Sequence, residues 1–205
     1  MSFYEQYCLP HIINFVCGMK DTQRQRAKVV PRATGRVLEI GMGSGLNVPF
    51  YDRDKVDMVW GLEPSVAMRR KAASNLAGAP FEIRWLDLPG EEIPLDDDAA
   101  DTVLLTYTLC TIPDWQRALE QMRRVLKPGG RLIFCEHGRA PDPAVRRWQE
   151  RLNPVWNALG GGCNLNRPIP TLIDRGGFNI QEIEAQYRPG PKFASFQYWG
   201  TATGA

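Results

Sequence analysis

A glycine-rich segment at residues 37–47 constrains the fold of this 205-residue chain more than any other part of the sequence. A short apolar run ends at Ile40, and Gly41, Gly43 and Gly45 follow it closely. Glycine adopts positive φ easily and lets a ligand approach the backbone, because it has no Cβ. In open α/β sheets, a loop of this kind after a strand is typical of a nucleotide site. The segment therefore predicts an α/β fold with a cofactor site at this loop.

Strand-like and helix-like patterns alternate along the rest of the chain. The helical period is clearest at residues 114–127, where apolar side chains recur on one face and Pro128 follows directly. Such alternation predicts a mostly parallel sheet with helices on both faces. We expect strands at residues 36–40, 56–62, 81–86, 102–106, 131–136, 179–185 and 195–203. We expect helices at residues 4–20, 65–75, 114–127, 145–159 and 169–174, with Pro154 kinking or dividing the fourth of them.

The residues around the glycines indicate which cofactor the loop suits. Glu63 lies 18 residues after Gly45, at the end of the second expected strand, where a carboxylate can accept both ribose hydroxyls of an adenosine. The dinucleotide fingerprint needs a further glycine at position 46, but Leu46 stands there. Glu39 would be poorly placed beside a pyrophosphate, whereas it suits a cationic amino group and a sulfonium. The loop therefore favours a sulfonium cofactor over a nicotinamide dinucleotide.

Three parts of the sequence resemble the class I methyltransferases that use S-adenosylmethionine (SAM). Residues 37–47 are similar to motif I of that family, and residues 126–134 to the turn into its fifth strand. Residues 91–106 are similar to the segment that joins its third and fourth strands. The resemblance implies a Rossmann-like α/β fold with a seven-stranded, mostly parallel sheet and helices on both faces. It also implies SAM as the cofactor, S-adenosylhomocysteine as the product, and a single domain over residues 1–205.

The family's cofactor-binding positions can be carried over residue by residue. The resemblance implies that Glu63 holds the ribose and that the glycines hold the methionine portion. Glu39 would face the amino end of the cofactor, directly or through water. Thr106, at the end of the fourth strand, would offer its backbone carbonyl to the same amino group.

The adenine position is less regular than the rest of the motif. Residues 88–91 would line the adenine, but Pro89 stands where many relatives have an acidic residue. Asp87, or the backbone of the residues after Pro89, would then take that contact. The expected cofactor-binding residues are Glu39, Gly41, Gly43, Gly45, Asn47, Glu63, Pro64, Asp87, Leu88, Gly90, Glu91 and Thr106.

A more particular resemblance lies in the second half of the chain. Residues 106–114, the pair Glu136 and His137, and residues 162–165 together resemble the methyltransferase-like thiol methyltransferases of animals and their bacterial relatives. That family's acceptors are small thiols, so the resemblance implies a small-molecule acceptor with a thiol as first choice. Phospholipid N-methylation and quinone C-methylation are the alternatives within the class. A nicotinamide-dependent oxidoreductase and a non-catalytic SAM-binding protein are the alternatives outside it.

His137 is the candidate catalytic residue. It follows the fifth expected strand, near the place expected for the transferred methyl group, and could take a proton from a thiol acceptor. The alternative is a histidine that hydrogen-bonds locally and positions a loop. Methyl transfer from a sulfonium needs no general base unless the acceptor must lose a proton, so both interpretations fit the class.

Charge and cysteine content argue against several other functions. The net charge is +2 without a block of Lys or Arg, which argues against nucleic acid as the main partner. The five cysteines are odd in number and form no C-x-x-C pair, so we expect neither a disulfide framework nor a metal site. This cysteine content fits a reducing compartment. The apolar stretch at residues 9–19 is too short to span a bilayer, and no positively charged segment precedes it. We therefore expect a cytoplasmic protein without stable membrane insertion.

Two regions lie outside the alternating core. Residues 1–30 are expected to form a helical lid, and residues 141–175 a helical insertion near the substrate pocket. On folds of this kind, elements outside the repeating core carry the variable specificity. We therefore expect both regions to shape the acceptor site.

Overall fold

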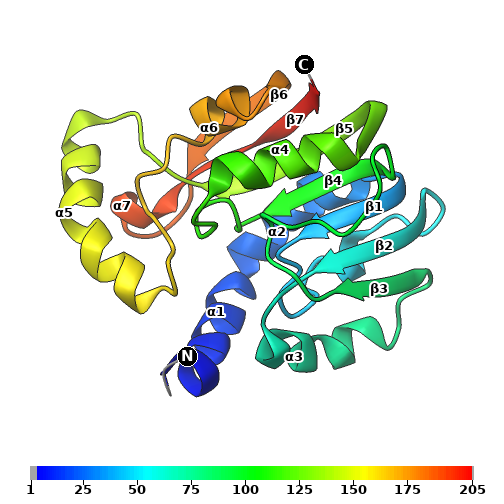
Figure 1. The fold of residues 1–205 in the computed structure, drawn as a ribbon. Coiled ribbons are helices and arrows are strands. Elements are labelled where there is room, and N and C mark those ends of the chain that lie inside the picture. The colour runs from blue at the N-terminus through cyan, green and yellow to red at the C-terminus, as the bar shows by residue number, and fades with distance from the viewer. Residues whose placement is uncertain (1–3, 205) are drawn as a thin grey trace.

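A seven-stranded β-sheet forms the centre of the structure (Figure 1). The computed structural model describes residues 4–204, so the first three residues of the expected lid and the last residue of the chain lie outside it. The strands are β1 Gly35–Ile40, β2 Val56–Leu62, β3 Glu82–Leu86, β4 Ala100–Thr106, β5 Leu126–His137, β6 Phe178–Tyr187 and β7 Phe196–Gly204.

The strand order of the sheet is β3-β2-β1-β4-β5-β7-β6. Only β7 runs antiparallel to its neighbours, and the other six strands share one direction. The chain builds β2 and β3 on one side of β1 and then crosses to β4 on the other side. This reversal opens a crevice at the carboxyl ends of β1 and β4, where ligands bind in open α/β sheets. The expected Rossmann-like, mostly parallel sheet is confirmed.

Helices cover both faces of the sheet (Figure 1). Helices α4 and α6 pack on one face and α2 on the other, while α1 and α5 project beside the carboxyl ends of the strands. Within residues 4–204, no helix combines the length and the apolarity needed to cross a bilayer. The helical elements are η1 Tyr4–Cys8, α1 Leu9–Cys17, α2 Lys20–Val29, η2 Val30–Arg32, η3 Val48–Phe50, α3 Val66–Leu76, α4 Trp115–Val125, α5 Pro143–Leu159, α6 Ile169–Arg175 and α7 Lys192–Ser195.

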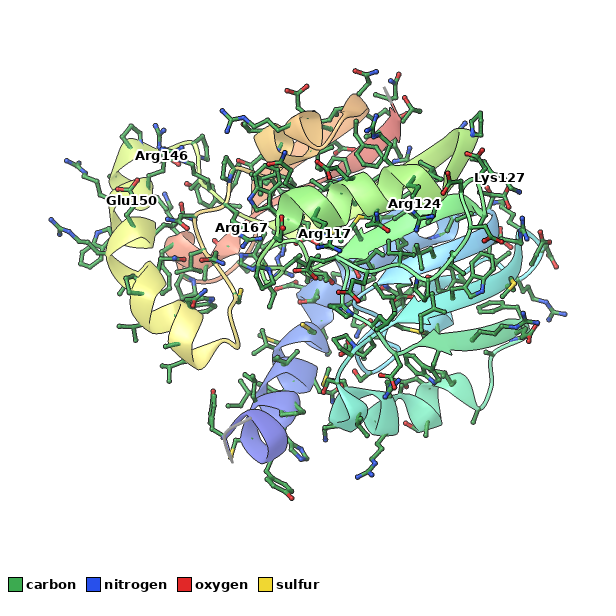
Figure 2. The ribbon with its side chains drawn as sticks, viewed as in Figure 1. Arg117, Arg124, Lys127, Arg146, Glu150 and Arg167 are labelled. Atoms are coloured by element: carbon green, nitrogen blue, oxygen red, sulfur yellow. The ribbon has the colours of Figure 1, made fainter. Side chains whose placement is uncertain are left out.

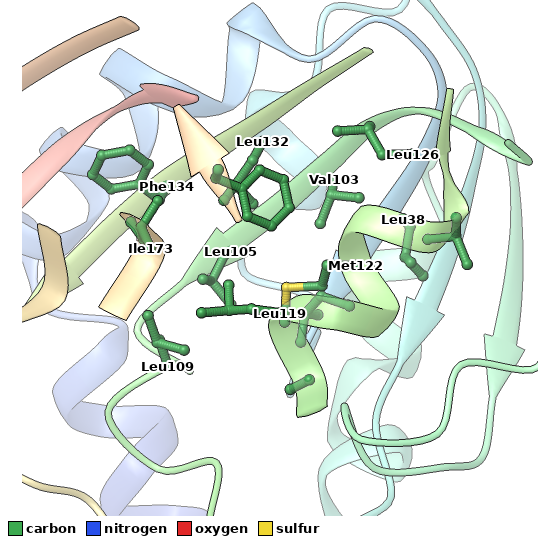
Figure 3. Packing of buried hydrophobic residues seen from close by; sticks show 14 of the residues in the cluster. Leu38, Val103, Leu105, Leu109, Leu119, Met122, Leu126, Leu132, Phe134 and Ile173 are labelled. Carbon is green, nitrogen blue, oxygen red and sulfur yellow. The ribbon is translucent and has the colours of Figure 1, made fainter. Parts of the chain in front are cut away.

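Alternate residues of the central strands build two separate cores. In β4, Val103 and Leu105 pack with α4 and α6, as Figure 3 shows for part of this cluster. Leu104 points the other way and packs with Val29 of α2. Because successive side chains of a strand point to opposite faces, an apolar run such as β4 has to be covered on both sides. The sheet is therefore held from both faces, which fixes the positions of its carboxyl ends.

Three local expectations need correction. Pro154 does not divide α5, which runs unbroken through it; the proline is exposed, so water can bind the carbonyl that it leaves free. Strand β5 begins at Leu126 rather than at residue 131, because Leu126 already pairs with Ala100 of β4. The helix expected at residues 4–20 ends at Cys17, and a second α-helix, α2, begins at Lys20 after a short break.

Two arginines, labelled in Figure 2, fix the segments on either side of β4. Arg124 of α4 donates to the backbone carbonyls of Ile93 and Leu95, each at 2.8 Å. Arg167 donates to the carbonyl of Ile112 at 2.7 Å and to that of Leu109. Hydrogen bonds from a charged donor are stronger than neutral ones, so these contacts hold the segments that precede β4 and follow it.

Candidate functional site

A cavity of about 440 Å³ opens at the carboxyl ends of β1, β2 and β4. Its volume lies within the range of roughly 300–1,000 Å³ that is typical of small-ligand sites. The walls come from the glycine loop, the end of β2, the loop after β3, the segment after β4 and helix α1. Of the expected cofactor-binding residues, those in the walls are Gly41, Gly43, Glu63, Pro64, Gly90, Glu91 and Thr106; those outside them are Glu39, Gly45, Asn47, Asp87 and Leu88.

Glu63 lies in the pocket wall just after β2, with 8% of its surface exposed. One carboxylate oxygen accepts from the backbone N–H of Gly43 at 3.0 Å, and the other from that of Ser65 at 2.8 Å. Burial raises the pKa of Glu63 above its usual value, although these two donors act against the rise. The two contacts hold the carboxylate in one orientation, and each oxygen still has a lone pair for a ligand hydroxyl.

The glycine loop needs its glycines for two different reasons. Gly41 has φ +64°, and a Cβ there would lie 2.4 Å from Cγ2 of Thr108, so a side chain cannot be accommodated in the pocket wall. Gly45 has φ +73° but faces α3, where a Cβ would lie 2.7 Å from Cδ1 of Leu76. Gly41 therefore lets the backbone border the pocket, whereas Gly45 lets the loop pack against a helix.

Glu39 is buried behind the glycine loop and outside the pocket walls. Its two oxygens accept from Asn47 Nδ2 at 2.8 Å and from the Tyr51 hydroxyl at 2.6 Å. Asn47 Nδ2 also donates to Thr106 Oγ1 at 3.0 Å. Asn47 thus connects Glu39 to Thr106, which lines the pocket.

Arg26 of α2 is a pocket residue that sequence reasoning missed. Its Nη1 donates to Asn47 Oδ1 at 2.5 Å and to Thr106 Oγ1 at 3.1 Å, and its guanidinium lies 5.3 Å from the centre of the Tyr107 ring. Its Nε is buried and has no hydrogen-bond partner within residues 4–204. A buried cationic donor in a pocket wall suits a carboxylate ligand. No motif marks Arg26, because it stands among the many polar residues of α2.

The buried carboxyl of Glu39 makes stability depend on pH. Burial raises its pKa to about 7, although its hydrogen bonds and Arg26 act in the opposite direction. In the unfolded chain the pKa of this carboxyl is the ordinary value for Glu. Between these two values the folded state binds more protons, so stability falls as pH rises through this range. The free energy of unfolding should be measured by urea titration at pH 5 and at pH 8. Between these pH values it should fall by roughly 2–3 kcal/mol more in the native chain than in Glu39→Gln. Equal losses in both proteins would contradict a raised pKa at Glu39.

The loop expected at the adenine is only partly in the pocket. Gly90 and Glu91 line it, and Glu91 Oε1 accepts from the backbone N–H of Asp114 at 3.2 Å, which holds the loop near the start of α4. Asp87 lies outside the walls, with a largely exposed side chain that pairs with Arg69 at 2.7 Å. Asp87 is thus engaged elsewhere, and of the two expected contacts only the backbone near Gly90 borders the pocket.

Helix α1 forms one wall of the pocket with residues such as Leu9, Ile13 and Cys17. The side chain of Asn14 joins this helix to the glycine loop, because its Oδ1 accepts from the Ser44 hydroxyl at 2.6 Å. At its N-terminal side, the Tyr4 hydroxyl donates to the carbonyl of Leu159 in α5 at 2.6 Å. Together, η1 and α1 therefore bridge the glycine loop and α5.

His137 does not line the pocket. It ends β5, and its Nε2 lies 3.2 Å from Cys163 Sγ. Burial alone would lower its pKa, but the neighbouring Cys163 and Glu136 raise it above the usual value. The geometry therefore engages His137 with a cysteine rather than with the cavity, and its role as a general base stays a prediction.

Fold and site together define an α/β protein with a pocket for an adenosine-containing cofactor at its topological switch point. A family described as "Methyltransferase domain" matches residues 38–134. The thiol S-methyltransferase TMT1B of Homo sapiens is 33% identical over 166 residues, which is 78% of this chain and 66% of that protein. A phosphatidylethanolamine N-methyltransferase of Cereibacter sphaeroides is 30% identical over 142 residues, covering 67% of this chain and 68% of the relative.

Solved structures agree on the fold. A SAM-dependent methyltransferase of Leishmania major superposes with a TM-score of 0.71 and 16% identity, over 98% of this chain and 80% of that one. This chain belongs to the SAM-dependent methyltransferase family, whose cofactor is S-adenosylmethionine. It spans slightly less than two thirds of the length of the thiol methyltransferases that it matches.

Proposed function

We propose that this protein transfers the methyl group of SAM to a small thiol. The observation that carries the reaction class is the pocket in which Glu63 and the glycine loop face each other at the end of the central strands. The thiol is supported by the relatives named thiol S-methyltransferases, which are 32–33% identical over about three quarters of this chain.

The residues of the pocket fit SAM part by part. The carboxylate of Glu63 suits the ribose hydroxyls, and the side-chain-free backbone at Gly41 suits a closely packed methionine portion. Arg26 places a cationic guanidinium in the pocket wall, which suits the carboxylate of that portion. The backbone near Gly90 borders the end left for the adenine.

The chemistry asks the protein mainly to align two reactants and to exclude water. When bound, SAM supplies a methyl group on a sulfonium, which is a good leaving group. Glu63, Arg26 and the glycine loop would fix one reactant, and α1 would close the cavity over the other. Alignment and water exclusion are the main contributions available here, because no charged intermediate has to be stabilised.

Arg26 is expected to bind the amino-acid end of the cofactor. Arg26→Lys should weaken S-adenosylhomocysteine binding about tenfold, because lysine keeps the charge but loses the fork of donors. Binding of 5′-methylthioadenosine, which has no amino-acid portion, should change little. Isothermal titration with both ligands tests this expectation. Equal weakening of the two ligands would assign Arg26 to structure rather than to carboxylate binding.

The acceptor can be tested directly with the purified protein. SAM consumption should be measured with alkyl thiols, aryl thiols, hydrogen sulfide, ethanolamine lipids and quinol analogues. We expect turnover with one or more thiols, rising with pH because the thiolate is the nucleophile. Turnover confined to the lipids or quinols would refute the thiol while leaving the methyltransferase class intact.

An ethanolamine phospholipid is the second candidate acceptor. The side chains of Phe15 and Val16 on α1 and of Trp148, Val155 and Leu159 on α5 are exposed, although both helices stand beside the pocket region. Exposed apolar and aromatic side chains on helices are typical of proteins that dock on a lipid surface. The lipid arm of the acceptor panel therefore includes ethanolamine lipids in vesicles as well as in detergent.

A further inference from the structure

Two cysteines and a histidine from distant parts of the chain meet beside the pocket. Cys110 follows β4, His137 ends β5, and Cys163 lies in the turn after α5. His137 Nε2 lies 3.2 Å from Cys163 Sγ, and Cys163 Sγ lies 3.6 Å from Cys110 Sγ. All three potential ligand atoms lie within 4.8 Å of one another. None of these residues lines the cofactor pocket, so the proposed reaction leaves the cluster unexplained.

We propose that Cys110, His137 and Cys163 form a binding site for a single zinc ion. Zinc binds thiolate sulfur at about 2.3 Å and imidazole nitrogen at about 2.0–2.1 Å, usually in a tetrahedron. Ligand atoms at these distances lie on the order of 3.5–3.8 Å apart. The separations of 3.2 and 3.6 Å are close to this spacing, and the third is below 4.8 Å, so a metal ion can enter after side-chain movements of about 1 Å.

Charge balance also favours a divalent metal. On binding, each of the two thiols gives up its proton, and the two thiolates cancel the two positive charges of the ion. The neutral imidazole contributes its nitrogen lone pair without adding charge. The assembly of ion, thiolates and imidazole is therefore neutral, which suits a site where Cys110 is buried and the other two residues are half-buried.

The surroundings hold the ligands in place. Asn164, next to Cys163, donates from its backbone N–H and its side chain to the carbonyl of Cys110, at 3.0 and 2.9 Å. Asn157 of α5 donates to the carbonyl of Gly162 at 2.8 Å. Trp156 Nε1 lies 3.4 Å from Cys163 Sγ, where its N–H can donate to a ligating thiolate. Groups of this kind orient the ligands of metal sites.

The cluster contains three protein ligands and no fourth. Within residues 4–204, no other His, Cys, Asp or Glu joins the group. Zinc with three protein ligands keeps its fourth position for water or another small molecule. Because Thr108 and Thr111 on either side of Cys110 line the pocket, a metal here would fix that wall against the turn after α5.

The test measures metal binding and does not depend on the methyl acceptor. The full chain should be treated with a chelator under reducing conditions and titrated with Zn²⁺ or Co²⁺. We expect one ion per chain by elemental analysis, release of about two protons per ion, and a cobalt spectrum with thiolate charge-transfer and tetrahedral bands. Failure to bind one ion per chain would overturn the proposal. A protein that contains a Cys110–Cys163 disulfide and no metal after purification in reducing buffer would also overturn it.

Variants assign the ligands. Cys163→Ser, at a half-buried position, should weaken zinc binding on the order of 100-fold or more, and Trp156→Phe by roughly tenfold. Cys8→Ser, which alters an exposed thiol, should leave affinity and stoichiometry unchanged. If Cys163→Ser does not fold, the proton count and the cobalt spectrum of the native chain still decide the question. Equal loss of binding in Cys8→Ser and Cys163→Ser would refute the assignment.

Discussion

A Glu63→Gln variant is expected to bind S-adenosylhomocysteine on the order of 10- to 100-fold more weakly than the native chain, which corresponds to roughly 1–3 kcal/mol. The buried carboxylate has both oxygens directed by the backbone of Gly43 and Ser65, so it offers charged acceptors to a ribose without reorganisation. In Gln, an NH₂ group replaces one of the two accepting oxygens. This donor would face the backbone N–H of Ser65 or Gly43, and it could no longer accept from a ribose hydroxyl.

Isothermal titration should separate this effect from others at the site. Both S-adenosylhomocysteine and 5′-methylthioadenosine should bind more weakly to Glu63→Gln, because both carry the ribose, whereas Arg26→Lys should affect only the first. Glu82→Gln, at an exposed position in the neighbouring strand β3, is the matched control and should bind both ligands normally. A folded Glu63→Gln protein with unchanged affinity would refute the ribose assignment.

A chain that begins at Met19, without η1 and α1, should fold but lose methyl transfer by roughly 10- to 100-fold. Helix α1 buries only Leu9 and Pro10, so its removal should cost little stability. It supplies a whole wall of the pocket, however, and its loss would open the cavity to water and leave the acceptor poorly aligned. Circular dichroism and thermal melts check folding, and the SAM-consumption assay measures the rate.

Point variants on the two sides of α1 distinguish an effect on the pocket from an effect on folding. Ile13→Ser changes a side chain in the pocket wall and should lower turnover, whereas Phe15→Ser changes a side chain that is 73% exposed and should not. Full turnover in the truncated chain would refute the idea that this helix completes the acceptor site. Equal losses in Ile13→Ser and Phe15→Ser would point to folding rather than to the pocket.

Local patterns in the sequence were enough to predict the alternating strands and helices and to bring Gly41 and Glu63 to the pocket wall. Apolar runs such as β4 and the amphipathic period of α4 depend on neighbours close in sequence, so they could be interpreted one segment at a time. The positions of Gly41 and Glu63 followed from the same logic, because each stands directly after a strand of the parallel sheet. All carboxyl ends in such a sheet meet at one edge, which brings these residues together.

Residues whose position depends on packing between distant segments could not be placed in this way. Asp87 directly precedes residues 88–91, which were expected to line the adenine. Its side chain is instead largely exposed and pairs with Arg69. Gly45 belongs to the glycine motif, yet its close neighbour is Leu76 of α3. A motif gives the order of residues along the chain, whereas the side on which each one lies depends on the helices that pack around the loop.

The sequence by itself determined the sheet, the glycine loop and the acidic residue after β2, because these follow from local periodicity and from the geometry of parallel strands. Only the tertiary structure brought Arg26 into the pocket and placed Glu39 in a buried network behind it. It alone also brought Cys110 to Cys163, 53 positions apart in the chain. No spacing rule connects such residues, because their meeting depends on how α2, β5 and the turn after α5 fold back onto the sheet.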